Sequence, residues 1–452
     1  MTSAPAASLT RDFTDLLGAW PADTPALLEQ CRLLLLDGLA VAVAGAAEPG
    51  PRLMAGLVRR EGTAGPATLV GHAFRTSVVH AARVNGMAMH VLDFEPMWNP
   101  PNHALSPLLP AVLALAELRE HEGAGPQGIA VLQAIARGVE AQGRLRLSSG
   151  QIEPATLTLH PPGVVGPLAA AIACGVMLGL PGDRLAAGAG IAASRSAGLL
   201  ANVGSMTKAL HCGDGAAHGL EAALLAQGGF TANDDAIGGP RGWGRSLFGT
   251  GFDPAPLLAP IVVPRALDPG PAWKLFPSQF ATHFAITAAL EAREAAGAHD
   301  LPGRIRRISL RTPPMPYIDR PSPSSGLEGK FSWQYTAVVA LLDGTVDPGS
   351  FTDARRFAPD AVALLARTVL VGDPTISGRF DRMHVDVTLD GVDGAVITRR
   401  CTAPLGSWTR PVPAARIRAK AAGLLGSGRA GDIAALLDAP AGFEVRALMA
   451  LL

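Results

Sequence analysis

The amino-acid sequence predicts a mainly α-helical protein with a large all-helical domain and a smaller α+β domain. Three observations support this fold class. The chain has 452 residues, more than one hydrophobic core usually supports. Before about residue 265, apolar residues recur every three and four positions, and after Pro264 the first alternating segments appear. We therefore expect domains over residues 1–265 and 266–404, with residues 405–452 returning to the helical domain.

Six apolar segments of the first domain are predicted as helices, because alanine is abundant in them and β-branched runs are short. They cover residues 24–46, 107–122, 126–147, 162–180, 183–202 and 214–227. The stretch 163–180 is apolar enough to suggest a membrane span. Its small residues and its internal proline favour instead a central helix packed closely among other helices.

The second domain combines strands and helices. Residues 306–311, 384–389 and 396–402 alternate between apolar and polar side chains as strands do. The last two segments are separated by the turn-rich sequence DGVDGA, which predicts a hairpin. Helices are expected over residues 281–296 and 332–342, between the early and late strands, and again over residues 413–452.

Charge and cysteine content exclude several classes of function. Acidic and basic residues cancel at 38 each, so nothing indicates a nucleic-acid or membrane partner. The four cysteines are scattered without metal-binding spacing, and we expect no metal and reduced thiols in a cytoplasmic protein. The N-terminal segment lacks the pattern of a signal peptide.

Lysine is scarce in this chain. Of 38 basic residues only Lys208, Lys274, Lys330 and Lys420 are lysines, which leaves 34 arginines. Lysine is a compact point charge, whereas arginine is a wide planar fork, so the two do not substitute freely. Either the four are leftover surface residues, or Lys208 and Lys274, which lie in glycine- and proline-marked connectors, bind a small anion.

Four ionisable residues stand near the predicted beginnings of apolar helices. His103 precedes Ser106 and Pro107, His160 precedes two prolines, Lys208 precedes Asp214, and Lys274 precedes Pro277. Helix N-termini offer unpaired N–H groups and partial positive charge, which suits carboxylate or phosphate binding. The alternative is that any helical bundle places polar residues at its helix ends.

Asp93 lies ten residues before His103 and is a candidate to orient or charge that imidazole. Alternatively, Asp93 is only a residue of the loop after a helix. His90, three residues earlier, is expected to be a packing residue on that helix.

Six segments together resemble the MmgE/PrpD family, which includes 2-methylcitrate dehydratases, cis-aconitate decarboxylases and an iminodisuccinate epimerase. The segments, in family order over residues 85–345, are NGMAMHVLDFEPMWNPPNH, HPPGVVGPLAAA, GSMTKALHCGDGAAHGLEAALLAQGGFTA, WKLFPSQFATH, YIDRP and GKFSWQYTAVVALLDG. The resemblance implies that the α+β domain is a lid closing on the helical domain, that the active site lies between them, that the protein is a homodimer, and that no cofactor is needed.

The resemblance to the decarboxylases also implies site residues. Catalytic roles fall on Asp93, His103 and His160, and substrate binding falls on Lys208, Lys274, Tyr317, Gln279 and Met97. Two of these depart from the family pattern. Met97 ends a segment that is usually DFDDT, so an acid and a hydroxyl are lost, and Gln279 replaces an expected histidine. His283, four residues later, is expected to be a packing histidine and not a substitute.

These residues suggest reaction at the carbon next to a carboxylate of a small di- or tricarboxylate. The first expectation is a lyase, an aconitate- or 2-methylcitrate-like decarboxylase or dehydratase. The second is a carbon-acid isomerase or epimerase, since all three reactions pass through an enolate-like species. A hypothesis of another class is a non-catalytic anion-binding homologue, which the lost polar groups would favour.

Overall fold

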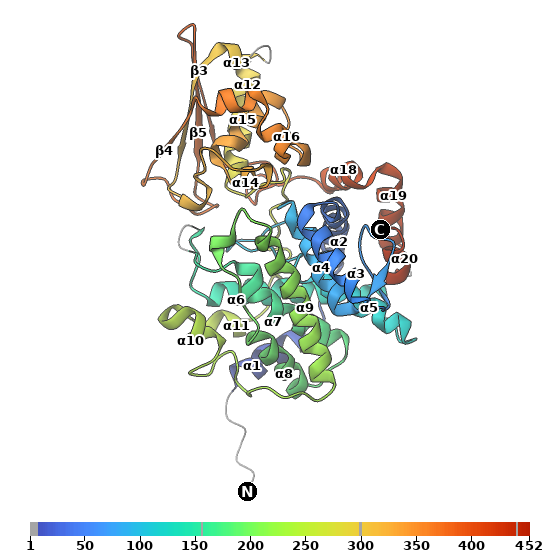
Figure 1. The fold of residues 1–452 in the computed structure, drawn as a ribbon. Helices are drawn as coiled ribbons and strands as arrows, with labels where there is room; N and C mark the ends of the chain where they lie inside the picture. Colours follow the sequence, from blue (N-terminus) through green and yellow to red (C-terminus); the bar gives the residue numbers. More distant parts are fainter. Residues whose placement is uncertain (1–7, 155–156, 298–300, 440–441) are drawn as a thin grey trace.

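The computed structural model describes residues 8–154, 157–297, 301–439 and 442–452, and shows a helical body beneath a smaller unit that contains a sheet (Figure 1). The helical body contains α1 (Leu9–Ala19), α2 (Pro25–Ala46), α3 (Pro49–Glu61), α4 (Val78–Val91), α5 (Leu109–His121), α6 (Gly128–Ser148), α7 (Pro161–Met177), α8 (Gly182–Ala193), α9 (Thr207–Gln227), α10 (Trp243–Phe248) and α11 (Ala255–Leu258). Two short strands, β1 (Ala67–Thr68) and β2 (Arg75–Thr76), pair beside α4 and α5. This is the mainly helical class that the sequence predicted.

The smaller unit carries a four-stranded sheet in the order β4-β3-β5-β6. Its elements are α12 (Thr282–Ala296), α13 (Leu301–Arg304), β3 (Ile305–Thr312), α14 (Gly326–Gly329), α15 (Trp333–Asp343), α16 (Asp353–Arg356), α17 (Pro359–Leu365), β4 (Thr368–Gly372), β5 (Val385–Gly391) and β6 (Val396–Cys401). The predicted β5–β6 hairpin is confirmed, while β4, which pairs in parallel with β3, was not predicted. Helix α12 packs on β5 and β6.

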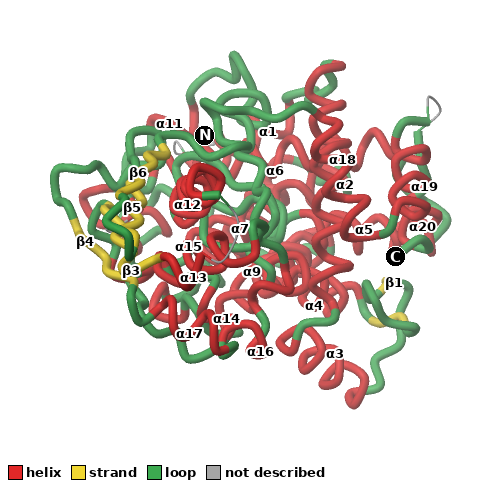
Figure 2. The backbone as a smooth tube through the Cα atoms, turned by 90° about the horizontal axis from the view of Figure 1, so that it is seen from above, coloured by secondary structure: helices red, strands yellow, loops and turns green. Residues whose placement is uncertain are grey.

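The chain after the sheet returns to the helical body. Helices α18 (Ala414–Leu425) and α19 (Ser427–Leu437) pack on α2, and α20 (Val445–Met449) packs on α5 (Figure 2). Ile417, Leu437 and Leu448 are buried in the same hydrophobic core as α2 and α5. The tail is therefore part of the helical body although it follows the sheet in sequence.

Helices α4, α7 and α9 form the centre of the helical body, and glycines allow α9 to approach both neighbours. A Cβ atom on Gly219 of α9 would lie 2.4 Å from the Ala170 Cβ of α7, and one on Gly213 would lie 2.3 Å from the Arg83 carbonyl oxygen of α4. Helix α7 is accordingly a buried central helix. In the described part of the chain, no helix is long and apolar enough to cross a membrane.

Three predicted helix boundaries are wrong, and in two of them a tertiary contact explains the error. Ser106 does not cap α5, because its hydroxyl donates to Glu95 and the helix begins at Leu109. Asp214 does not cap a helix either, because α9 begins earlier, at Thr207, and Asp214 binds Arg83. The helix expected over 183–202 ends at Ala193.

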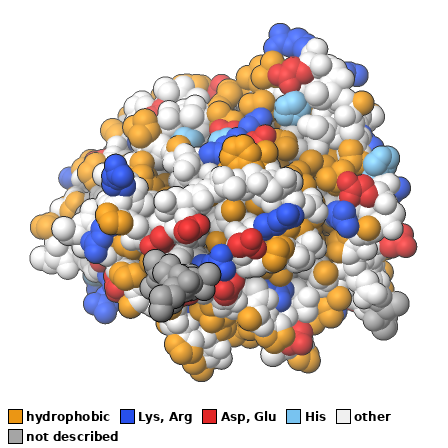
Figure 3. Space-filling view, turned by 90° about the horizontal axis from the view of Figure 1, so that it is seen from below, with side chains coloured by type: hydrophobic (Ala, Val, Ile, Leu, Met, Phe, Trp, Pro, Cys, Tyr) orange, Lys and Arg blue, Asp and Glu red, His pale blue; other side chains and the backbone are white. Residues whose placement is uncertain are grey.

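The surface of the helical body mixes both signs of charge. On the face shown in Figure 3, basic and acidic side chains are interspersed with apolar and neutral ones. This is consistent with a chain whose acidic and basic residues are equal in number.

Candidate active site

The site is organised around Asp93, which follows the end of α4. Leu92 caps the helix, and Asp93 then adopts a left-handed backbone conformation with φ of 51°. Such a conformation costs a non-glycine residue about 1–2 kcal/mol, although Asp tolerates it better than most. The side chain is 2% exposed. A strained, buried carboxylate at a helix end is a feature of functional sites.

Three cationic or imidazole groups surround the Asp93 carboxylate. Lys274 Nζ lies 2.6 Å from Oδ1, His103 Nε2 lies 3.1 Å from Oδ1, and Lys208 Nζ lies 3.3 Å from Oδ2. Burial raises the pKa of Asp93, but Lys208, Lys274 and His103 together outweigh burial and hold that pKa well below its ordinary value. Asp93 is therefore a carboxylate, and its charge is shared among these partners.

Glu95 is a second buried carboxylate of the site. It accepts a hydrogen bond of 2.5 Å from His90 Nδ1 and one of 2.9 Å from the Ser106 hydroxyl. His103 Nδ1 lies 3.3 Å from the same oxygen, so the ring of His103 stands between Asp93 and Glu95. Burial raises the pKa of Glu95, but His90 and His103 outweigh burial and hold that pKa well below its ordinary value. Glu95 is therefore ionised.

The expectation that His90 only packs is wrong. Its Nε2 lies 2.7 Å from Lys208 Nζ, and its Nδ1 contacts Glu95. Because an ammonium only donates, Nε2 accepts and Nδ1 carries the proton donated to Glu95. Burial, followed by the charge of Lys208, lowers the pKa of His90 to about 4. His90 is thus a neutral imidazole linking Lys208 to Glu95.

His160 caps α7, as its position before two prolines predicted. Its backbone N–H donates to the Gly198 carbonyl, and its ring Nδ1 lies 3.3 Å from Nδ1 of His211 on α9. Burial and then Lys208 hold the pKa of His160 well below its ordinary value, so its imidazole is neutral and able to accept a proton.

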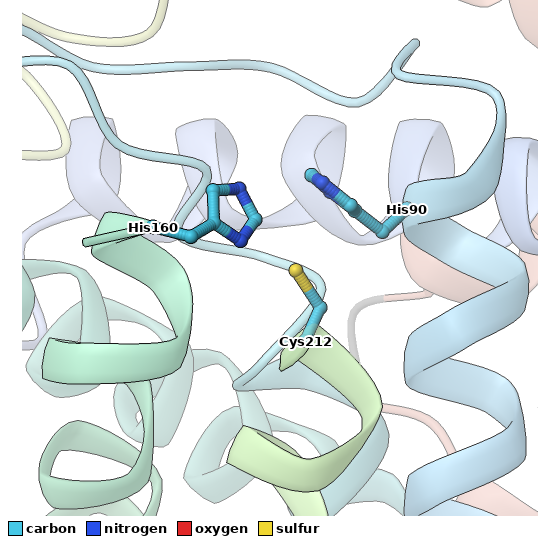
Figure 4. Close-up of side chains that lie close together, drawn as sticks. All are labelled: His90, His160 and Cys212. Atoms are coloured by element: carbon cyan, nitrogen blue, oxygen red, sulfur yellow. The ribbon is translucent and has the colours of Figure 1, made fainter. Parts of the chain in front are cut away.

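His90, His160 and Cys212 converge from α4, α7 and α9 (Figure 4). Their nitrogen and sulfur atoms lie within 4.8 Å of one another, a set that resembles metal ligands. However, both ring nitrogens of His90 already have partners, and burial raises the pKa of the Cys212 thiol. A cation bound through His90 would have to displace either the Lys208 ammonium or the hydrogen bond to Glu95. His90, Glu95 and His103 form a second such set, in which Nδ1 of both histidines faces Oε1 of Glu95.

A cavity of about 70 Å³ opens onto this network. Its lining includes Asp93, Met97, His103, His160, Lys208, Gln279 and Tyr317, seven of the eight residues predicted for the site. Gln279, Phe280, Tyr317, Phe331 and Phe380 come from the smaller unit and the segment leading into it, so both parts of the molecule contribute to the wall. Gln279 Nε2 donates to Tyr317 Oη at 3.1 Å, and burial raises the pKa of Tyr317.

Lys274 differs from the other predicted residues because it is completely buried behind Asp93 and does not line the cavity. Its charge is directed to the Asp93 carboxylate. His283 packs against the rings of Phe276 and Phe280 and is also absent from the cavity wall, as expected. Sequence reasoning missed Glu95, His90 and His211 as members of the network. The sequence contains one indication of their role: His90 and Glu95 stand close to Asp93 along the chain, and His211 stands close to Lys208.

The fold is mainly helical, and its two parts enclose lysine, imidazole and carboxylate groups. These features define a class of proteins that bind small molecules at acid–base sites. The chain belongs to the MmgE/PrpD family: the MmgE/PrpD N-terminal domain matches residues 13–255 and the MmgE/PrpD C-terminal domain matches residues 276–432.

Similar proteins include the cis-aconitate decarboxylase of Mus musculus, 33% identical over 77% of this chain and 72% of that protein. The cis-aconitate decarboxylase of Homo sapiens is 34% identical over 75% of this chain and 70% of that protein. The cis-aconitate decarboxylase of Aspergillus terreus is 27% identical over 89% of this chain and 85% of that protein.

Proposed function

We propose that this protein is a lyase that acts at the carbon next to a carboxylate of a small di- or tricarboxylate. Decarboxylation or dehydration of an aconitate- or 2-methylcitrate-like substrate is the proposed reaction. One observation carries the proposal: one cavity is lined by Lys208, His103 and His160. The Asp93 carboxylate contacts His103 and Lys208. The similarity to proteins named cis-aconitate decarboxylase supports it.

Lys208 is the proposed substrate cation. Its ammonium reaches the cavity wall and is shared between Asp93 and His90. A substrate carboxylate placed there would accept from the ammonium, and negative charge that develops in an enolate-like transition state would be stabilised. Lys274 would act indirectly, by holding the Asp93 charge. Gln279 and Tyr317 would bind from the smaller unit, which we propose is a lid, and Met97 would contact an apolar part of the substrate.

His103 is the proposed group that moves the proton at carbon. In decarboxylation, the bond to the leaving carboxylate breaks, CO2 departs, and the electron pair spreads onto the conjugated carboxylate near Lys208. The protonated His103 ring then delivers a proton to carbon, and Asp93 and Glu95 on either side stabilise the imidazolium before that transfer. In dehydration, the neutral His160 ring would remove the proton next to the carboxylate, and the protonated His103 ring would give its proton to the departing hydroxyl, which leaves as water.

The family resemblance also supports three broader proposals. The reaction needs no organic cofactor or metal, the protein works as a homodimer, and it is cytoplasmic. The high apolar fraction of 48% suits a chain that buries a subunit interface.

The test is incubation with cis-aconitate, citrate, 2-methylcitrate and related diacids in deuterated water. Release of CO2 with deuterium bound at carbon, or formation of the unsaturated product by loss of water, supports the lyase. Deuterium at carbon with neither product indicates an isomerase or epimerase. Tight binding with no exchange indicates a non-catalytic homologue.

Lys208→Met should lower kcat/KM at least about 30-fold, which corresponds to about 2 kcal/mol of transition-state stabilisation. Arg399→Ala, which removes an exposed cation from β6, is the control and should leave kcat/KM unchanged. Equal rates for the wild-type protein and the Lys208 variant would contradict the role of Lys208.

A further inference from the structure

All four lysines of the chain contact one five-residue segment, residues 90–94. Lys208 contacts His90 and Asp93, and Lys274 contacts Asp93. Lys330 donates to the Val91 carbonyl and Lys420 donates to the Phe94 carbonyl. The lysines come from α9, from the connector before α12, from the end of α14 and from α18. A chain with 34 arginines has therefore placed every lysine around the end of α4.

Lys330 is buried without a carboxylate partner. It is 2% exposed, and in the described part of the chain no carboxylate lies within 4 Å of its ammonium. Its Nζ donates to Val91 O at 3.2 Å, which satisfies one of the carbonyls left open at the end of α4. A buried ammonium with so little compensation costs stability, so packing alone does not explain why a lysine stands there.

Lys420 reaches the same segment from the opposite end. Its Nζ donates to Phe94 O at 2.7 Å, lies 2.9 Å from Asp37 Oδ1, and stands 4.0 Å from the centre of the Phe94 ring. Asp37 belongs to α2 and is completely buried. The C-terminal tail thus contributes a cation to the loop that carries Asp93.

We infer that Lys330 and Lys420 are positioning residues that hold the backbone carbonyls on the two sides of Asp93. Val91 and Phe94 flank the residue whose φ is 51°, and fixing both carbonyls stabilises the left-handed turn that directs the carboxylate to His103. This inference rests on the proposed function only in requiring that Asp93 serve the reaction.

A lysine suits this role better than an arginine. A single carbonyl oxygen accepts from a compact ammonium, whereas a guanidinium presents several donors in a plane and needs more space and more acceptors. Both positions are enclosed, with the Lys420 side chain 6% exposed and Lys330 2% exposed. The inference therefore also accounts for lysine in a chain that uses arginine elsewhere.

Lys330→Met is the first test, because it removes the ammonium and leaves no unpaired carboxylate behind. We expect kcat to fall about 10-fold with KM within about twofold of the wild-type value. The melting temperature should stay the same or rise. The acid limb of the kcat/KM profile should move to higher pH, because an Asp93 carboxylate that is less well placed against its cations is easier to protonate. A residue that only fills space would not lower kcat while leaving Tm intact.

The second test compares Asp37→Asn with the double variant Asp37→Asn, Lys420→Met. Both lack the buried carboxylate of Asp37, so they differ only in the ammonium that donates to Phe94 O. We expect the double variant to have a kcat about 10-fold below that of Asp37→Asn.

Crystal structures of these variants separate failure of the inference from failure of the proposed function. If the wild-type protein turns over no substrate, the φ of Asp93 and its distance to His103 still report on positioning. Either variant with an unchanged Asp93 conformation, and with unchanged kcat and pH profile where turnover occurs, would overturn the inference. A shifted Asp93 carboxylate supports it.

Discussion

At the scale of single residues, the site depends on His103 lying between two buried carboxylates. Nε2 faces Asp93 at 3.1 Å and Nδ1 faces Glu95 at 3.3 Å. Both carboxylates are ionised, because the lysines and imidazoles around them outweigh the effect of burial on their pKa values. An imidazole in this position can take up a proton without leaving an uncompensated charge.

Asp93→Asn should impair both stability and turnover. The substitution leaves Lys274 completely buried with no carboxylate, since its one ion pair is with Asp93 in the described part of the chain. We expect the free energy of unfolding to fall by about 3 kcal/mol and kcat/KM to fall about 100-fold. Urea unfolding and steady-state rates measure the two effects.

Asp432→Asn, at an exposed position of α19, is the control and should change neither quantity. A stable and active Asp93→Asn variant would show that the charge of Asp93 holds neither Lys274 nor His103.

Residue patterns predicted which side chains would gather but not how they would pair. Two signals predicted that distant segments meet at one site: the family resemblance and the positions near helix starts of His103, His160, Lys208 and Lys274. The role of Glu95 was not predictable, because it depends on His90 and Ser106 lying on different elements that meet only in the folded chain. Lys274 was expected to bind substrate, but nothing in its sequence position indicated that its ammonium would instead pair with Asp93.

At the scale of elements, the crossing of α4 and α9 sets the geometry of the network. A Cβ atom on Gly86 would lie 2.9 Å from the Gly213 Cα, so the two backbones nearly touch. This close approach brings Lys208 of α9 within 2.7 Å of His90 of α4. The Lys208–His90 contact is therefore a consequence of two glycines facing each other.

Gly213→Ala should separate these helices. The added Cβ would lie 2.3 Å from the backbone oxygen of Arg83, which cannot move without displacing α4. We expect a loss of about 2 kcal/mol in the free energy of unfolding and about a 10-fold fall in kcat/KM.

Gly431→Ala on α19 is the matched control for that variant. A Cβ atom at Gly431 meets nothing within 4 Å, so alanine should raise the free energy of unfolding by up to about 1 kcal/mol. Equal stability changes for the two glycine variants would mean that the α4–α9 distance is not fixed by Gly213.

Periodicity found the long helices and the hairpin but misplaced ends that tertiary contacts decide. Helix α9 begins seven residues before the predicted start because Asp214 pairs with Arg83 instead of capping. Strand β4 was not predicted because it has only five residues. Its exposed positions are the apolar Val369 and Val371, so apolar and polar residues do not alternate along it. Short edge elements carry too little pattern to be recognised without the sheet they join.

At the scale of the whole molecule, the helical body and the smaller unit each have a hydrophobic core. One core joins α2, α4, α5, α6 and the tail helices, and the other joins α12, α15 and the sheet. Phe280 and Phe331 of the second core line the cavity together with polar residues of the helical body such as His103 and His160, so the site exists only when both parts are folded and in contact.

The buried imidazoles predict that the protein loses stability in mild acid. His90 has a pKa lowered to about 4, and His160 and His283 have pKa values well below ordinary, in each case mainly because of burial. In the unfolded chain these groups take up protons near pH 6.5, so the unfolded state binds more protons than the folded state below that pH. The free energy of unfolding should therefore fall as pH decreases from about 6.5 to about 4, with about 3 kcal/mol from His90 alone.

Urea unfolding at several pH values between 7.5 and 4 checks this prediction. His160→Asn should reduce the slope, whereas His121→Gln, at an exposed position, should leave it unchanged. Asp93 and Glu95 add a further loss only below about pH 4, where unfolded carboxylates become protonated. A constant free energy of unfolding between pH 7 and 5 would contradict the assignment of neutral buried imidazoles.

The gathering of every lysine at the end of one helix also determines how the native surface reacts. No lysine is prominent on the native surface, since the four lysine side chains are between 0% and 10% exposed. Acylating reagents and enzymes that modify ε-amino groups would therefore find Lys274, Lys330 and Lys420 closed in the folded protein and open only after it unfolds. Acylation of these three lysines would be a chemical signature of molecules that have lost the native fold.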